Sequence, residues 1–111
     1  MLTTDKLTTM IMDEYNKYPD LFEDHPIEIA ENTNSITITK VLLKNQLNKT
    51  VLSLFVSWRN FTDDLYFDDS ENETYTLMYL WYGMSFSSLC DVAKAMKNDY
   101  IVNKNIIKLL D

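Results

Sequence analysis

Gly83 is the only glycine in this chain of 111 residues, and this scarcity limits the turns and ligand-binding loops that the chain can form. Glycine adopts positive φ without strain and lets backbone approach a ligand closely, so phosphate-cradling loops and dinucleotide-binding turns need several glycines. Nucleotide chemistry of those two kinds is therefore excluded. Tight turns must use other residues, and asparagine tolerates positive φ better than most residues that carry a Cβ.

Two stretches that contain asparagine, residues 31–35 and 44–49, are therefore predicted to be turns. Around them, apolar and polar residues alternate with the period of two that is typical of antiparallel strands. Three strands are predicted from these runs: Ile27 and Ile29; either Ile36 and Ile38 or the offset set Thr37, Thr39, Val41 and Leu43; and Leu52, Leu54, Val56 and Trp58. Residues 74–82 are rich in aromatic and β-branched residues, which favours a fourth strand, with a helix as the competing interpretation.

Helical periodicity appears near both ends of the chain. The first stripe predicts a helix that Thr3 or Thr4 caps and that Pro19 ends; it comprises Leu7, Met10, Ile11, Glu14, Tyr15 and Tyr18. A second helix is predicted from Ser85 onward, with its stripe formed by Phe86, Leu89, Cys90, Ala93 and Met96. Residues 100–111 could add a short third helix. On this stripe the Cys90 thiol is expected to be buried and inert.

We therefore expect an α+β fold in one domain, residues 1–111. It comprises an N-terminal helix, a three- to four-stranded antiparallel sheet, and one or two C-terminal helices that pack on one sheet face. With 46% apolar and 13% aromatic residues the chain can bury a core, which excludes a disordered acidic tail.

The net charge of −7 is unevenly distributed along the chain. Residues 18–36 and 60–76 contain eleven of the 17 acidic residues and no Lys or Arg, so the rest of the chain is net positive. Two acid-only stretches indicate either solvated loops, which are commonly acidic, or a surface for a basic partner.

If the stretches form a surface, their carboxylates could imitate phosphates and occupy the groove of a basic nucleic-acid-binding protein, without binding nucleic acid directly. The six acids from Asp63 to Glu73 would lie about 6 Å apart in an extended chain, which is sparser than the phosphates of one DNA strand. The hypothesis therefore requires the two stretches to lie side by side. The candidate partner-binding residues are Asp63, Asp64, Tyr66, Asp68, Asp69, Glu71, Glu73, Asp20, Glu23, Asp24, Glu28 and Glu31.

The order of elements and the acidity are similar to those of small phage-encoded inhibitors that act as DNA mimics, including some anti-CRISPR and anti-restriction proteins. The likeness is at the level of fold, with no shared motif. It implies a non-enzymatic inhibitor, of phage or mobile-element type, that docks its acidic face on a basic protein.

Two alternatives remain open. The six Met and fourteen aromatic residues could exceed what one core buries, which favours an interaction or immunity protein, in one form a homodimer, with an apolar surface. A small carboxylate-based hydrolase or metal-binding protein is the second alternative, and it would need His25, the single histidine, to meet two or more carboxylates. No cofactor or metal site is expected, because one histidine and one cysteine give no metal-ligand spacing.

The single cysteine also favours a reducing compartment, since it cannot form an internal disulfide. The N-terminal residues carry no basic and apolar export pattern, and the most apolar stretch is about half as long as a membrane span requires. The expected location is the cytoplasm, which would be that of the host for a phage-encoded protein.

Overall fold

The computed structural model describes residues 3–60 and 73–98, in the order helix, five strands and helix. The elements are α1 (Thr4–Tyr15), β1 (Ile27–Asn32), β2 (Ser35–Lys44), β3 (Thr50–Asn60), β4 (Glu73–Trp81), β5 (Met84–Phe86) and α2 (Leu89–Asn98). The α+β class is confirmed, with one more strand than the three or four expected.

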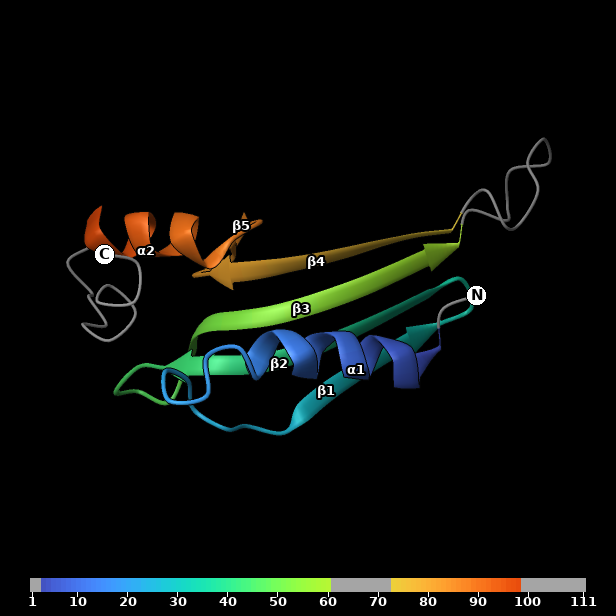
Figure 1. Ribbon diagram of the computed structural model, residues 1–111, viewed down its shortest axis with the longest axis horizontal. Helices are drawn as coiled ribbons and strands as arrows, with labels where there is room; N and C mark the ends of the chain where they lie inside the picture. Colours follow the sequence, from blue (N-terminus) through green and yellow to red (C-terminus); the bar gives the residue numbers. More distant parts are fainter. Residues whose placement is uncertain (1–2, 61–72, 99–111) are drawn as a thin grey trace.

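The five strands form one antiparallel sheet in the order β1-β2-β3-β4-β5, so each strand pairs with its neighbour in the sequence (Figure 1). Helix α1 packs across β2 and β3, and α2 packs against β4 and β5. Buried residues of both helices and of one sheet face form a single core cluster, which places the two helices on the same face. We call this the helix face and the opposite side the open face.

Alternation along the strands decides which residues enter this core. Leu52, Leu54, Val56 and Trp58 are all buried on the helix face, as their period of two predicts. In β2 the first of the two expected sets is the buried one, with Ile36 opposite Trp58 and Ile38 opposite Val56. Residues 74–82 form a strand and not a helix, and Tyr79 and Trp81 of β4 face the same core.

Helix α1 begins where its sequence predicts. The Thr3 hydroxyl accepts a hydrogen bond from the Lys6 amide at 3.2 Å, which satisfies one of the free N–H groups of the first turn. Leu7 and Ile11 are fully buried against the sheet. The apolar stripe therefore sets which side of α1 faces the strands.

The second helix was predicted to begin too early. Residues 84–86 form β5 instead, because Tyr82 and Gly83 both adopt positive φ (46° and 81°) and turn the chain back against β4. Helix α2 then starts at Leu89, and the Ser88 hydroxyl accepts from the Asp91 amide at 3.2 Å. Its buried stripe is Leu89, Val92, Ala93 and Met96, whereas Cys90 is exposed, so the expectation of a buried thiol was wrong.

Asparagine replaces glycine in only one of the two predicted turns. Asn48, between β2 and β3, has φ of 63°, and the Asn45 side chain accepts hydrogen bonds from the amides of Leu47 and Lys49. The turn between β1 and β2 consists of Thr33 and Asn34, and neither has positive φ. The predicted helix in residues 100–111 lies outside the described residues.

Candidate functional site

The first acidic stretch is spread along one side of the sheet. Glu28 and Glu31 lie on β1, whereas Asp20, Glu23 and Asp24 lie in the connection between α1 and β1. The Glu23 amide donates to the Leu42 carbonyl at 2.9 Å, near the end of β2, and Glu31 lies opposite Ile36, near its start. Six residues of strand between these β2 positions correspond to about 20 Å, so this stretch forms no single cluster.

A buried lysine holds the connection in place. Lys40 continues the alternation of Ile36 and Ile38, and its side chain is 3% exposed on the helix face. Its amino group donates to the Asp24 carboxylate at 2.9 Å and to the His25 carbonyl at 2.7 Å, and it lies 4.5 Å from the centre of the Tyr15 ring. Lys40 was not among the predicted site residues, although a lysine that continues an alternation of apolar residues is a signal visible in the sequence.

A break in the register of β2 supplies the second anchor. The pairing of β2 with β3 shifts on both sides of Leu43, and the Leu42 carbonyl accepts from the Glu23 amide. A bulge of this kind frees a backbone group for a partner outside the ladder. Strand β2 therefore positions Glu23 and Asp24. Because the Asp24 carboxylate binds Lys40 within the molecule, part of the negative charge of this segment is already paired.

Strand β1 is the most exposed strand of the sheet. Only Ile27 is partly buried, and every residue from Glu28 to Asn32 is exposed. Glu28 lies opposite Thr39 and projects to the open face, whereas Glu31 lies opposite Ile36 on the helix face and accepts a hydrogen bond from the Thr4 hydroxyl. No described strand pairs with the outer edge of β1, so its outward backbone groups are free of described strand partners and its two carboxylates lie on opposite faces of this edge.

The second acidic stretch falls mostly outside the described residues. This applies to Asp63, Asp64, Tyr66, Asp68, Asp69 and Glu71, while Glu73 is described only as the first residue of β4. The segment is attached at Asn60 and Glu73, which lie opposite each other in the ladder of β3 and β4. Ser35 lies opposite Arg59, so the attachment point and the β1–β2 turn are at the same end of the sheet (Figure 1).

Among the predicted residues of the first acidic stretch, Glu31 is therefore the one that lies nearest to this attachment point. In the sheet the row from Glu31 runs through Ile36 and Trp58 to Tyr75, which spans three strand spacings, or about 14 Å. Asp24 and Glu23 lie toward the opposite end. A shared acidic surface would therefore be centred on β1 and the Asn60–Glu73 end of the sheet.

The surroundings of His25 give little support to a hydrolase or metal site at this residue. His25 Nε2 lies 2.7 Å from a Glu23 carboxylate oxygen, but the neighbouring Asp24 points to Lys40. Within residues 3–60 and 73–98, no group of three His, Cys, Asp or Glu side chains could hold a metal ion. The described part of the chain thus offers His25 one carboxylate and not the two that a hydrolase of this kind would need.

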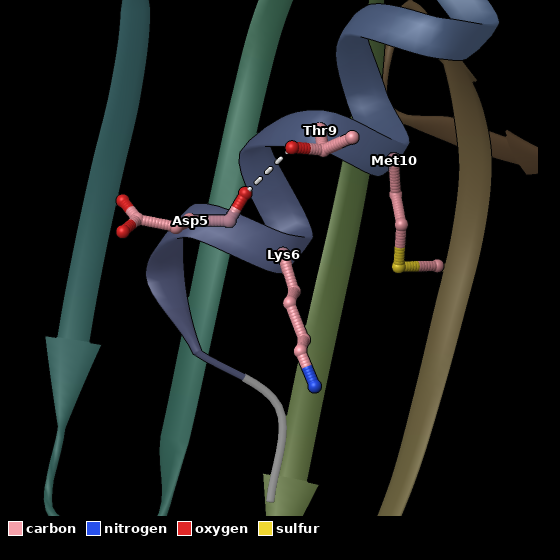
Figure 2. Close-up of a pocket in the computed structure, with 4 residues that line it drawn as sticks. All are labelled: Asp5, Lys6, Thr9 and Met10. Carbon is pink, nitrogen blue, oxygen red and sulfur yellow. Dashed lines mark hydrogen bonds between the residues drawn. The ribbon is translucent and has the colours of Figure 1, made fainter.

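A shallow, open surface pocket of about 400 Å³ lies beside the first turns of α1, lined by Asp5, Lys6, Thr9 and Met10. Figure 2 shows the Asp5 carboxylate directed toward the β1 side and the side chains of Lys6 and Met10 toward β3 and β4. The Thr9 hydroxyl is bonded to the Asp5 carbonyl at 3.0 Å. These four residues bring together no nucleophile and base, so the pocket has no catalytic geometry.

One further carboxylate has a structural partner. The Tyr79 hydroxyl donates to Glu14 at 2.7 Å, and Lys17 contacts the other oxygen at 2.7 Å. Burial raises the pKa of Glu14, but the hydrogen bonds from Lys17 and Tyr79 together outweigh this and hold it below 4.5. Burial, and then the bond to Glu14, raise the pKa of Tyr79 strongly. This group connects α1 to β4 and is not part of a binding surface.

The large exposed apolar side chains of the described residues lie on several different elements. Ile29 is on β1, Tyr75 is near the start of β4, Leu47 is in the β2–β3 turn, and Tyr82 and Met84 flank Gly83.

Comparison with known proteins finds no match to a protein-family model, a curated protein or a solved structure. Of the helices described, none has both the length and the apolar character to cross a bilayer.

Proposed function

We propose that this protein is a small non-enzymatic binding protein, of the inhibitor type, that presents an acidic surface to a basic nucleic-acid-binding protein. One observation carries the proposal: Glu28 and Glu31 are exposed on an edge strand whose outer backbone meets no described strand. The Glu31 end of this strand lies at the end of the sheet to which the second acidic segment is attached.

The geometry favours a partner that combines positive charge with an extended shape. Edge backbone can hydrogen-bond an added strand, and alternating side chains of that strand point to the two faces of the sheet. Glu28 would receive a Lys or Arg on the open face, and Glu31 would receive one on the helix face. Charges at an exposed edge also disfavour pairing with a second acidic chain.

The test uses two double variants with equal charge. Glu28→Gln with Glu31→Gln removes two carboxylates from β1, whereas Asp13→Asn with Asp91→Asn removes two exposed carboxylates from the helices. Both variants change the net charge of −7 by the same amount. Partners are captured from the native host at 50 mM salt, identified, and titrated against each variant.

We expect the β1 variant to weaken binding about 2- to 30-fold, because each of the two exposed ion pairs contributes about 0.2–1 kcal/mol. The helix variant should bind within about twofold of the parent. Raising salt from 50 to 200 mM should weaken the parent complex steeply, and duplex DNA should compete for the same partner. Binding that is insensitive to salt, or equal losses in the two variants, would contradict the proposal.

A further inference from the structure

Ile29 is a large apolar side chain that lies half-exposed on the edge strand β1. It is 51% exposed, although its partner in the ladder, Ile38, is fully buried on the helix face. The difference arises because α1 packs mainly across β2 and β3 and leaves the helix face of β1 partly uncovered. The outer half of the Ile29 side chain therefore faces the position that an added strand would occupy.

Two carboxylates flank Ile29 in a fixed pattern. Glu31 lies two positions later and on the same face of the sheet, whereas Glu28 directly precedes Ile29 and projects to the open face. The Thr4 hydroxyl donates a hydrogen bond to Glu31 and so connects this carboxylate to the first turn of α1. Figure 2 shows that the Asp5 carboxylate of the same turn is also directed toward the β1 side.

Positive charge on neighbouring elements is directed away from this edge. Lys40 is 3% exposed and already bonded to Asp24, and Figure 2 shows the Lys6 side chain directed toward β3 and β4. Among the described residues, no Lys or Arg forms an ion pair with Glu28 or Glu31. The outer edge of β1 therefore combines one exposed apolar side chain with unpaired negative charge.

We propose that β1 binds an antiparallel strand with the pattern basic, any residue, apolar, basic, read from its N-terminus. All four strand pairs of the sheet are antiparallel, and this pairing is slightly more stable per residue than the parallel one. The first basic residue then lies opposite Glu31, the apolar residue opposite Ile29, and the second basic residue opposite Glu28. The inference rests on the proposed function, and it specifies the segment that the basic partner contributes.

The spacing of the two basic residues follows from the geometry of a strand. Residues three positions apart project to opposite faces, so each basic side chain meets one of the two glutamates. Residues two positions apart project to the same face, which leaves one basic side chain without a carboxylate opposite. Backbone hydrogen bonds add affinity that depends little on sequence, whereas pairs of opposite charge and pairs of β-branched residues depend on register. Specificity therefore comes from spacing and not from total charge.

Three capped peptides of equal composition test the spacing. The probe is Thr-Thr-Lys-Thr-Val-Lys-Thr-Thr. One control, Thr-Thr-Lys-Thr-Lys-Val-Thr-Thr, places both lysines on one face, and the other, Thr-Thr-Lys-Val-Thr-Lys-Thr-Thr, moves the valine to the open face. Binding at about 50 mM salt is followed through the NMR chemical shifts of the β1 amides. We expect the first control to bind about 2- to 30-fold more weakly than the probe, because it loses an ion pair and the contact with Ile29, and the second about 1.5- to 5-fold.

A double-mutant cycle locates the apolar contact. Ile29→Thr keeps a β-branched residue and should weaken binding of the probe about 1.5- to 5-fold, after which replacing the valine of the probe with threonine should have no further effect. Leu47→Thr, which removes an exposed apolar side chain from the β2–β3 turn, should leave the dissociation constant within about 1.5-fold.

Unchanged β1 amides, equal binding of the three peptides, or independent effects of Ile29 and the valine would overturn the inference. Equal binding of the three peptides through β1 would leave the proposed function standing. The proposed function fails on its own test, when the captured partner loses equal affinity for the β1 variant and the helix variant.

Discussion

The two sides of the sheet are attached to the rest of the molecule by different chemistry. On the β1 side, Lys40 is buried and binds the Asp24 carboxylate and the His25 carbonyl under the Tyr15 ring. On the β4 side, Tyr79 and Trp81 are buried in the main core, and α2 packs over them. Polar contacts thus position the exposed acidic edge, whereas aromatic burial supports the uncharged one.

The two edges of the sheet also differ in charge. The β1 edge carries Glu28 and Glu31, which under the proposed function receive basic side chains of a partner. Residues 74–78 of β4 carry no charged side chain.

Removal of the Trp81 side chain should have the largest effect on stability. Trp81 is fully buried and lies opposite Leu52, so Trp81→Ala should lower the free energy of unfolding by about 3–5 kcal/mol. Urea denaturation followed by circular dichroism measures this. A loss below about 1 kcal/mol would show that aromatic burial does not hold the β4 side together.

Two substitutions of Lys40 separate the contribution of side-chain packing to stability from that of charge on the β1 side. Lys40→Ala should cost about 2 kcal/mol through the lost packing of its methylene stem. Lys40→Met keeps that volume and leaves Asp24, whose side chain is 84% exposed, hydrated by water, so its cost should stay below about 1 kcal/mol. The same denaturation measurement compares the two variants, and equal costs would assign the stabilisation to the ion pair.

The Tyr79 hydroxyl should contribute less to stability than the Trp81 side chain and no more than the packing of the Lys40 stem. Tyr79→Phe removes one hydrogen bond to a carboxylate and should cost about 1–2 kcal/mol at pH 7. Because the folded-state pKa of Glu14 lies below 4.5, its contribution is present above pH 4.5 and is lost as the pH falls through the folded value.

Denaturation at pH 7 and at pH 3 measures this contribution of Glu14. Acidification should destabilise Tyr79→Phe less than the parent, because the variant has lost one of the bonds that lower the pKa. Glu14→Gln is the control, since it keeps an acceptor for Tyr79 but does not titrate. An acid dependence identical in the parent and both variants would contradict the assignment.

The smallest effect on the free energy of unfolding is expected for Trp58→Phe. Its side chain is buried, but its indole N–H has no hydrogen-bond acceptor among the described residues. A buried donor without a partner costs about 1–3 kcal/mol, so Trp58→Phe loses apolar area and also removes that cost. The net change should stay within about 1 kcal/mol, whereas the matched Trp81→Phe should destabilise more. The reverse order would contradict this account of the two tryptophans.

Local patterns predicted most of this fold. The spacing of Leu7 and Ile11 placed α1, and alternation placed Trp58 and its neighbours in the core. The three residues of β5 are too few to show a period, and its formation depends on the turn at Tyr82 and Gly83. Cys90 falls one position from Leu89 on α2, so a small error in the helix start moved it from the exposed to the buried side.

The candidate site was less predictable because it depends on contacts between distant residues. Composition identified the acidic stretches, but the separation of Glu23 from Glu31 along β2 follows from the pairing of strands. The burial of Lys40 follows from its carboxylate and carbonyl partners, which lie 16 and 15 residues away in the chain, respectively. The open edge of β4 likewise follows from how few residues β5 contains.

The order of the strands has a consequence for how the protein is made. Each strand pairs with the strand before it, and α1 packs on β2 and β3, so these contacts are complete once residue 60 has left the ribosome. Folding can then proceed from the N-terminus without waiting for the C-terminal half. Until β4 emerges, one side of β3 has its backbone hydrogen-bonding groups unpaired, which makes it the surface of the nascent chain most open to pairing with other chains.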